Sequence, residues 1–115
     1  MSVPVHRIES ADSAAAIGLS QSEHWFQGVW WFHSVNLQNE NVAAGEEGQI
    51  LLQFDTDTFD ADHVFHVVEM GNTRRGAPLN IGLGFPARDC LVVGQVDSIG
   101  ATVHRLTVLA WKIGV

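Results

Sequence analysis

The segment LNIGLGF, residues 79–85, decides the fold class because its apolar side chains occupy every second position. Successive side chains of a β-strand point to opposite faces, so this alternation predicts a strand with one apolar and one polar face. The segment QILLQFD, residues 49–55, repeats the pattern in Ile50, Leu52 and Phe54. Both segments therefore indicate strands that cover a core on one side only.

Further runs rich in Val, Ile, Leu, Phe, Trp and Thr extend from these segments in both directions, with short connections that favour antiparallel neighbours. Residues 1–21 lack such runs and predict a short irregular N-terminal arm, with at most one short strand at Val3–Ile8. Such strands form either a sandwich or a small barrel, and we expect one domain, residues 1–115, folded as a six-stranded antiparallel β-sandwich. The strands are expected at His24–Leu37, Gln49–Asp55, Asp62–Met70, Pro78–Phe85, Cys90–Asp97 and Thr102–Ile113.

Two of these strands carry apolar side chains on both faces. In the first long strand, strict alternation places Trp31 and Val35 on one face. It places Trp30 and Phe32 on the other. The last strand has two apolar faces as well, and together they form more apolar surface than one small sandwich can hide. The sequence therefore predicts a homo-oligomer.

Composition excludes several classes of partner. Thirteen acidic residues against six Lys and Arg give a formal net charge of −7, which leaves no broad basic patch for nucleic acid or for an anionic membrane. Apolar runs such as Val29–Phe32 are too short to span a bilayer, and no basic and apolar leader opens the chain. We expect a soluble protein, with the cytoplasm favoured over secretion, and the single Cys90 excludes an intrachain disulfide.

Histidines are the most suggestive chemical groups in the sequence. His63, His66 and Glu69 approach the ligand pattern of a cupin metal site, which His33 or His104 could complete. On a strand, however, residues three apart point to opposite faces, so His63 and His66 would not chelate one ion. We therefore expect no metal, no cofactor and no enzymatic activity, and we keep a cupin-like metal-dependent small enzyme as an alternative.

Two other features have weaker chemical meaning. The acidic segment 55–62 offers enough carboxylates for calcium, but it lacks the spacing of an EF-hand loop and contains an apolar residue, Phe59. A solvated turn is the simpler interpretation, with calcium as the alternative. Cys90 opens an apolar strand, where cysteine is most often a small buried side chain with an inert thiol.

A family resemblance runs through Phe54 with Phe59, the expected strands His63–Glu69, Leu79–Phe85 and Leu91–Asp97, and the closing segment Thr102–Ile113 with its late Trp111. In these residues the later part of the chain resembles the H-type lectins, the small sugar-binding domains of snail agglutinins and discoidins. That resemblance implies an antiparallel sandwich, assembly as a trimer, and recognition of galactose or N-acetylgalactosamine at clefts between subunits.

The same resemblance suggests where a sugar would bind. Arg105 lies where the family has a ligand-facing residue, and Asn80 stands where it has an arginine. The loop that supplies an acidic contact corresponds to a stretch that contains Asn39, Glu40 and Asn41. These five residues are the expected sugar contacts of an oligomeric, lectin-like protein whose partner is a glycan or small polar ligand.

One departure from the family keeps an alternative function open. Ile99-Gly100 replaces a Trp-His pair that contacts sugar in the H-type lectins, and it can neither stack on a sugar nor hydrogen-bond to one through a side chain. The alternative is a structural or protein-interaction β-sandwich without a sugar site.

Overall fold

The computed structural model describes residues 5–13, 18–39, 46–98 and 103–115. All strands in this part of the chain belong to one antiparallel sheet with the order β1-β6-β2-β5-β3-β4, and it contains no helix. The expected antiparallel all-β fold is thus confirmed. The strands are β1 (Val5–Ser13), β2 (Gly18–Asn39), β3 (Glu47–Phe54), β4 (Phe65–Asn72), β5 (Leu79–Ser98) and β6 (Val103–Gly114).

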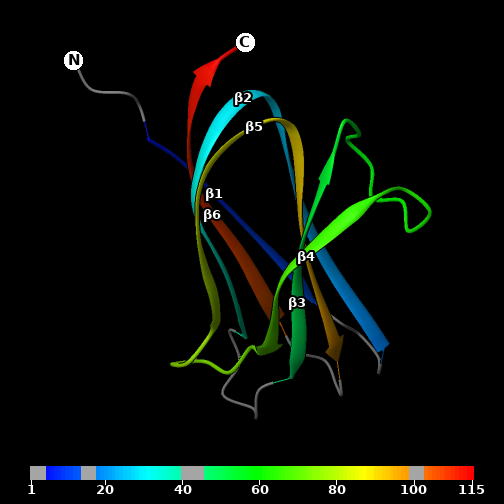
Figure 1. Ribbon diagram of the computed structural model, residues 1–115. Coiled ribbons are helices and arrows are strands. Elements are labelled where there is room, and N and C mark those ends of the chain that lie inside the picture. The colour runs from blue at the N-terminus through cyan, green and yellow to red at the C-terminus, as the bar shows by residue number, and fades with distance from the viewer. Residues whose placement is uncertain (1–4, 14–17, 40–45, 99–102) are drawn as a thin grey trace.

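Strands β2 and β5 are much longer than the others and pair with each other along nearly their whole length. Strand β6 pairs with β2 only at residues 29–39 of β2, whereas β3 pairs with β5 only at residues 90–96 of β5. The sheet therefore has two halves that share the two long strands, which arch over together at one end of the molecule (Figure 1). We call them the β6 half (β1, β6 and residues 29–39 and 79–88) and the β3 half (residues 18–26 and 90–98, β3 and β4).

The backbone at the bend needs unusual dihedral angles. Gly28 has a φ of +94° and Asp89 a φ of +50°, and the register of the β2–β5 pair shifts between Phe26 and Val29. The Gly28 N–H donates a hydrogen bond of 2.8 Å to the Asp89 carboxylate, which ties the two strands together. A Cβ at position 28 would lie 3.0 Å from the Gly114 carbonyl oxygen, so glycine is required there for space as well as for φ.

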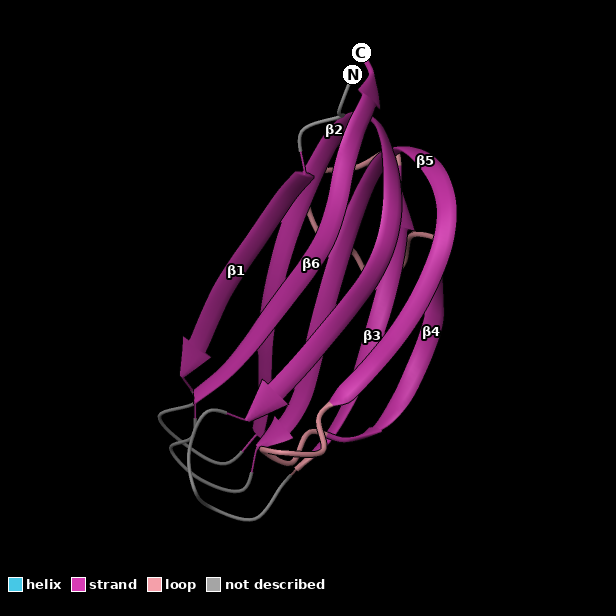
Figure 2. Ribbon diagram, turned by 90° about the vertical axis from the view of Figure 1, so that its left-hand side faces the viewer, coloured by secondary structure: helices cyan, strands magenta, loops and turns pink. Residues whose placement is uncertain are grey.

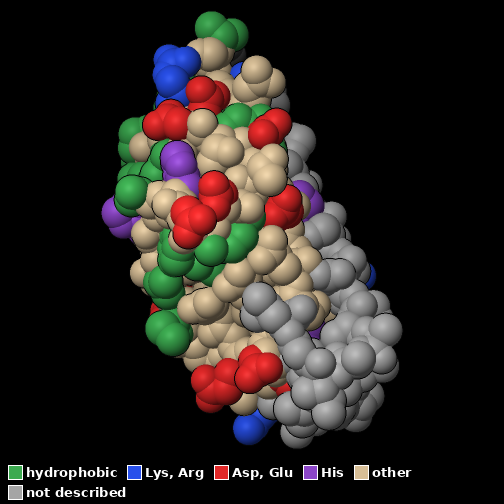
Figure 3. All heavy atoms as spheres, turned by 90° about the vertical axis from the view of Figure 1, so that its right-hand side faces the viewer, with side chains coloured by type: hydrophobic (Ala, Val, Ile, Leu, Met, Phe, Trp, Pro, Cys, Tyr) green, Lys and Arg blue, Asp and Glu red, His purple; other side chains and the backbone are tan. Residues whose placement is uncertain are grey.

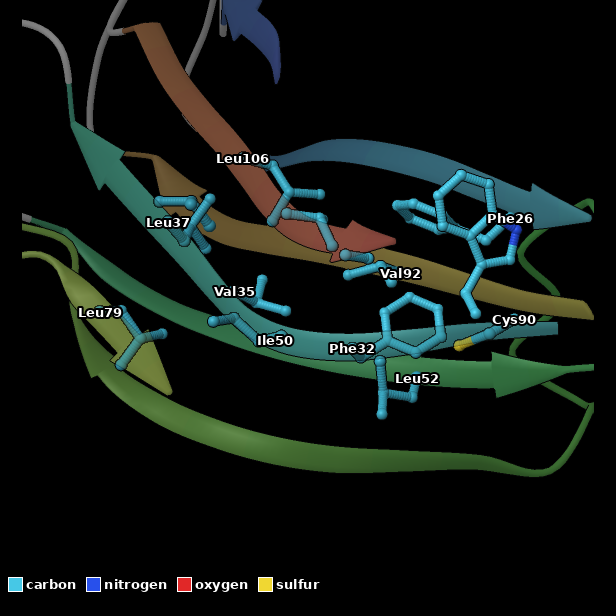
Figure 4. Packing of buried hydrophobic residues seen from close by; sticks show 14 residues of the cluster. Phe26, Phe32, Val35, Leu37, Ile50, Leu52, Leu79, Cys90, Val92 and Leu106 are labelled. Atoms are coloured by element: carbon cyan, nitrogen blue, oxygen red, sulfur yellow. The ribbon is translucent and has the colours of Figure 1, made fainter. Parts of the chain in front are cut away.

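The core lies inside the bend, where the two halves of the sheet meet (Figure 4). Gly94 in the β3 half shows how closely they approach, because a Cβ there would lie 3.0 Å from Leu37 and 3.2 Å from Leu106 of the β6 half. Two edge-on ring contacts, from Phe26 to Trp30 and from Phe26 to Phe32, fill the space next to the bend. The buried apolar cluster consists of Phe26, Trp30, Phe32, Val35, Leu37, Ile50, Leu52, Leu79, Cys90, Val92, Val96, Leu106, Val108 and Ala110.

The structure corrects the expected break between residues 85 and 90. The predicted strands Pro78–Phe85 and Cys90–Asp97 form one strand, β5, and Pro86 lies inside it opposite Trp31. Proline cannot donate to a sheet, but at this point β5 has only β2 as its neighbour, so no second partner needs its missing N–H. The positive φ of Gly84 and Asp89 absorbs the local irregularity.

Two further expectations about β1 and β2 are wrong. The N-terminal arm was expected to be irregular apart from at most one short strand at Val3–Ile8, but β1 continues to Ser13 and pairs with β6, and β2 begins as early as Gly18. Strict alternation also fails in β2, where a register shift between Phe32 and Ser34 changes the phase of the strand. As a result Val35 is fully buried in the core, whereas Trp31 is only half-buried and paired with the half-buried Trp111.

Candidate functional site

The outward side of the β6 half faces the viewer in Figure 2. Register places its side chains in rows across β6, β2 and β5, because directly paired residues share a face. We call this surface the open face; it consists of Arg105, Thr107, Leu109 and Trp111 from β6, Trp31, Ser34, Asn36 and Gln38 from β2, and Asn80, Gly82 and Pro86 from β5. All residues of the open face are half-buried or exposed.

One end of the open face is aromatic. Trp31 pairs with Trp111 across β2 and β6, and both side chains are half-buried. The exposed His33 ring lies 6.2 Å from the Trp111 ring at an interplanar angle of 35°. Aromatic rings that remain half-exposed provide an apolar platform with polar N–H groups at its margin. This is the kind of surface that accepts the C–H face of a sugar ring.

The middle of the open face is polar. Asn36 pairs with Asn80 on one side and with Thr107 on the other, which brings two amides and a hydroxyl into one row. A Cβ on Gly82 or Gly84 would meet no atom within 4 Å, so the described chain leaves open space at these two positions. Such side chains can both donate and accept hydrogen bonds, as sugar hydroxyls require.

The expected sugar contacts are not all placed together. Asn80 is exposed and Arg105 half-buried, and both lie on the open face in neighbouring rows. Asn39 is fully buried, and its N–H donates a hydrogen bond of 2.7 Å to the Thr73 carbonyl oxygen. Glu40 and Asn41 lie outside the described residues.

Asn39 belongs to a buried polar cluster at the end of the molecule opposite the bend. Glu46 Oε1 lies 3.3 Å from His104 Nε2, and neither side chain is more than 1% exposed. The Thr73 hydroxyl and its N–H both donate to the Glu46 carbonyl oxygen at 2.9 Å. The cluster thus joins the ends of β2 and β4 to the starts of β3 and β6, and its burial gives it a structural role.

Sequence reasoning missed the aromatic part of the open face. The phase change in β2 moves Trp31 away from Val35 and beside Trp111, and simple alternation could not predict that pairing. In β6 the alternation holds, because Leu106, Val108 and Ala110 are buried while the intervening residues are half-buried. The late tryptophan of β6 was therefore the one signal that could have located this end of the site.

The histidines proposed for a cupin-like site do not lie together in the structure. Strand β4 begins only at Phe65, so His63 lies in the preceding loop, where its Nε2 is 3.0 Å from the Phe54 carbonyl oxygen. The His66 ring packs near the Phe54 ring at 5.9 Å. Among the described residues, no group of three or more His, Cys, Asp or Glu side chains is placed to hold a metal ion.

The acidic loop between β3 and β4 is a cover for the β3 half. Phe59 packs on a second buried cluster on the outward side of that half and lies 5.9 Å from the Phe65 ring. The Gln53 side chain, fully buried, donates to the Asp60 carbonyl oxygen at 2.8 Å and accepts from the Asp60 N–H at 3.2 Å. The covered cluster consists of Leu51, Leu91 and Val93.

Cys90 is fully buried in the main core, and burial raises the pKa of its thiol to about 12. A thiol with so high a pKa is not ionised near neutral pH and is a poor nucleophile. The interpretation of Cys90 as a small buried side chain agrees with this placement.

Comparison of the sequence with models of known protein families and with curated proteins gives no match. No helix in the described part of the chain is long and apolar enough to cross a membrane. A function for this protein must therefore be argued from the open face itself.

Proposed function

We propose that this protein is a non-enzymatic carbohydrate-binding protein that recognises galactose or N-acetylgalactosamine type sugars on the open face. The observation that carries the proposal is the neighbourhood of a half-exposed tryptophan pair, Trp31 and Trp111, and a flat row of amide and hydroxyl groups. The rings would stack on the apolar face of a sugar, and Asn36, Asn80 and Thr107 would form hydrogen bonds with its hydroxyl groups. The face-to-face halves of the bent sheet would then correspond to the two sheets of the lectin-like sandwich.

Binding at a single site should be weak, because the contacts on a flat face compete with water. A dissociation constant near 1 mM corresponds to about 4 kcal/mol. Useful avidity would come from several sites on one homo-oligomer, for which we propose a trimer. Light scattering at micromolar concentration measures this directly, and a monomer mass would remove the trimer from the proposal.

The sugar site is tested by retention on galactose and N-acetylgalactosamine matrices. Asn80→Ala, Asn36→Ala and Trp111→Ala should each reduce retention, because each removes one contact of the open face. Asp97→Ala is the control, because Asp97 is an exposed residue of the β3 half. Equal retention of the parent and all three open-face variants, or no retention of the parent on any sugar, would refute the site.

A second candidate function is association with a second copy of this chain along β4. Strand β4 lies at one end of the strand order, and a bulge opposite Ile50 and Leu51 breaks its alternation. Val67 and Met70 pair with outward-facing residues of β3 and are 45% and 67% exposed. Figure 3 shows hydrophobic side chains gathered on this side of the molecule, with acidic side chains around them. Loss of self-association in a Val67→Ser, Met70→Ser double variant, with sugar retention unchanged, would assign β4 to protein contacts.

A further inference from the structure

The open face is longer than a single sugar unit. Its aromatic end, where Trp31 pairs with Trp111, and its amide row, where Asn36 pairs with Thr107, lie four residues apart along β6. Four residues of a strand span about 13 Å. This distance exceeds the length of one pyranose ring. Rings and amides can therefore contact the same ligand only if that ligand is a chain of sugar units.

The row between the aromatic end and the amide row has small residues on β2 and β5. Ser34 pairs with Gly82 there, and Leu109 is their neighbour on β6. Gly82 is exposed and its φ is not positive, and a Cβ added to it would meet no atom within 4 Å. A glycine in a strand lets a ligand approach the backbone closely. Strands β2 and β5 thus leave an open path between the rings and the amides, on the side seen in Figure 2.

Both ends of this path offer groups that suit sugar units. The Trp31 and Trp111 side chains are half-buried, so part of each ring remains accessible. Asn80 is exposed beside Asn36, which also pairs with Thr107. Within the described ranges, the side chains of this amide row form no hydrogen bond with another residue. Their donors and acceptors are therefore available to hydroxyl groups.

We infer that the ligand of the open face is a linear oligosaccharide of about three or more pyranose units, which lies along β2 and β5 from the tryptophan pair to the amide row. The inference rests on the proposed function, because it concerns the same face and the same class of sugar. It also gives Gly82 a role, since this position must stay small for the chain to pass. Linked units make the second contact intramolecular, so a chain that reaches both groups binds more tightly than a monosaccharide.

The test measures the affinity of the full chain for galactose, galactobiose, galactotriose and galactotetraose by titration calorimetry. Affinity should rise with length and level off at a gain of about tenfold over galactose, which exceeds the few-fold statistical gain from repeated units. Gly82→Leu should remove most of this gain, because the added side chain stands across the path. Asn36→Ala should also reduce it, because it removes a contact at the amide row, and it tests the inference even if Gly82→Leu does not fold.

Asp97→Leu is the matched control, because it adds the same side chain at an exposed position of the β3 half, and its gain should equal that of the parent. Galactose binding with no more than the statistical gain would refute the inference and leave the proposed function intact. A gain of parental size in Gly82→Leu or Asn36→Ala would also refute the inference, as would a lost gain in Asp97→Leu. Binding of neither galactose nor its oligomers would refute both the proposed function and the inference. Melting temperatures within a few degrees of the parent exclude misfolding as the cause.

Discussion

The outward sides of the two halves of this sheet differ in what covers them. On the β3 half, the loop between β3 and β4 folds back, and Leu51, Leu91 and Val93 beneath it are at most 1% exposed. On the β6 half, the corresponding positions of β2, β5 and β6 are half-buried or exposed, and they mix tryptophan with amides and glycine. A surface that the chain covers with its own loop contributes stability, whereas an uncovered surface of this composition is available to a ligand.

The largest expected effect on stability comes from replacing a leucine by alanine, compared between the β3 half and the open face. Leu91→Ala should lower the free energy of unfolding by about 2–5 kcal/mol, because it leaves a cavity beneath the loop. Leu109→Ala on the open face should cost about 1 kcal/mol, because its side chain is only half-buried. Urea denaturation measures both. Equal losses would show that the open face is covered in solution, as an oligomer interface would cover it.

Phe59→Ala should have the next largest effect, about 1–3 kcal/mol, because this ring closes the loop over Leu51 and Leu91. Proteolysis within residues 55–62 should become faster in the variant, since the loop loses its apolar anchor. Phe59→Leu, which keeps most of the apolar contact, should be cut at nearly the parent rate. Unchanged cleavage in Phe59→Ala would mean that the hydrogen bonds between Gln53 and Asp60 hold the loop without the ring.

Cys90 gives a pH-dependent prediction within the core. Its folded pKa, about 12, lies above that of an unfolded thiol, so the folded state retains the proton as pH rises. The resulting stabilisation is fully present below the unfolded pKa and is lost between about pH 9 and pH 12, at roughly 1 kcal/mol per pH unit at the start. Cys90→Ala should lose less stability than the parent between pH 8 and pH 10. Parallel losses would show that Cys90 ionises freely in the folded state.

The smallest expected effect on stability is that of a methyl group added to the open face, which we compare with one added in the core. Gly82→Ala on the open face should change stability by less than about 0.5 kcal/mol, because the added Cβ meets no atom within 4 Å. Gly94→Ala should destabilise measurably, because its Cβ would approach Leu37 at 3.0 Å. Thermal unfolding of the Gly82→Ala and Gly94→Ala variants measures both effects. A clear loss of stability in Gly82→Ala would mean that another chain or segment contacts the open face.

Local pattern predicted most strands but not how they join. Alternation located β3 and β6 within a few residues, because the register of β3 with β5 is unbroken and residues 103–111 of β6 alternate between half-buried and buried. It failed at Pro86, since a sequence does not show that β5 has only one neighbour there. It also failed in β2, where the phase changes near His33 and decides which tryptophan faces outward.

The candidate site was predictable only in part for the same reason. Asn80 and Arg105 were found from the resemblance, and they share the open face. Trp31 and Asn36 were not predicted as site residues, because their placement follows from a bulge and from pairing between distant strands. The burial of Asn39 likewise depends on its contact with Thr73, which no local pattern reveals.

The shared strands β2 and β5 also determine when this chain can fold during its synthesis. Gly18 pairs with Ser98, and β1 pairs with β6, so the first strands of the described chain find their partners only near its far end. Contacts of such high sequence separation slow folding. Until β5 and β6 have left the ribosome, the tryptophan-rich β2 has no partner strand to cover its backbone. A nascent chain stalled before residue 79 should therefore expose an unpaired β2 and be prone to aggregation.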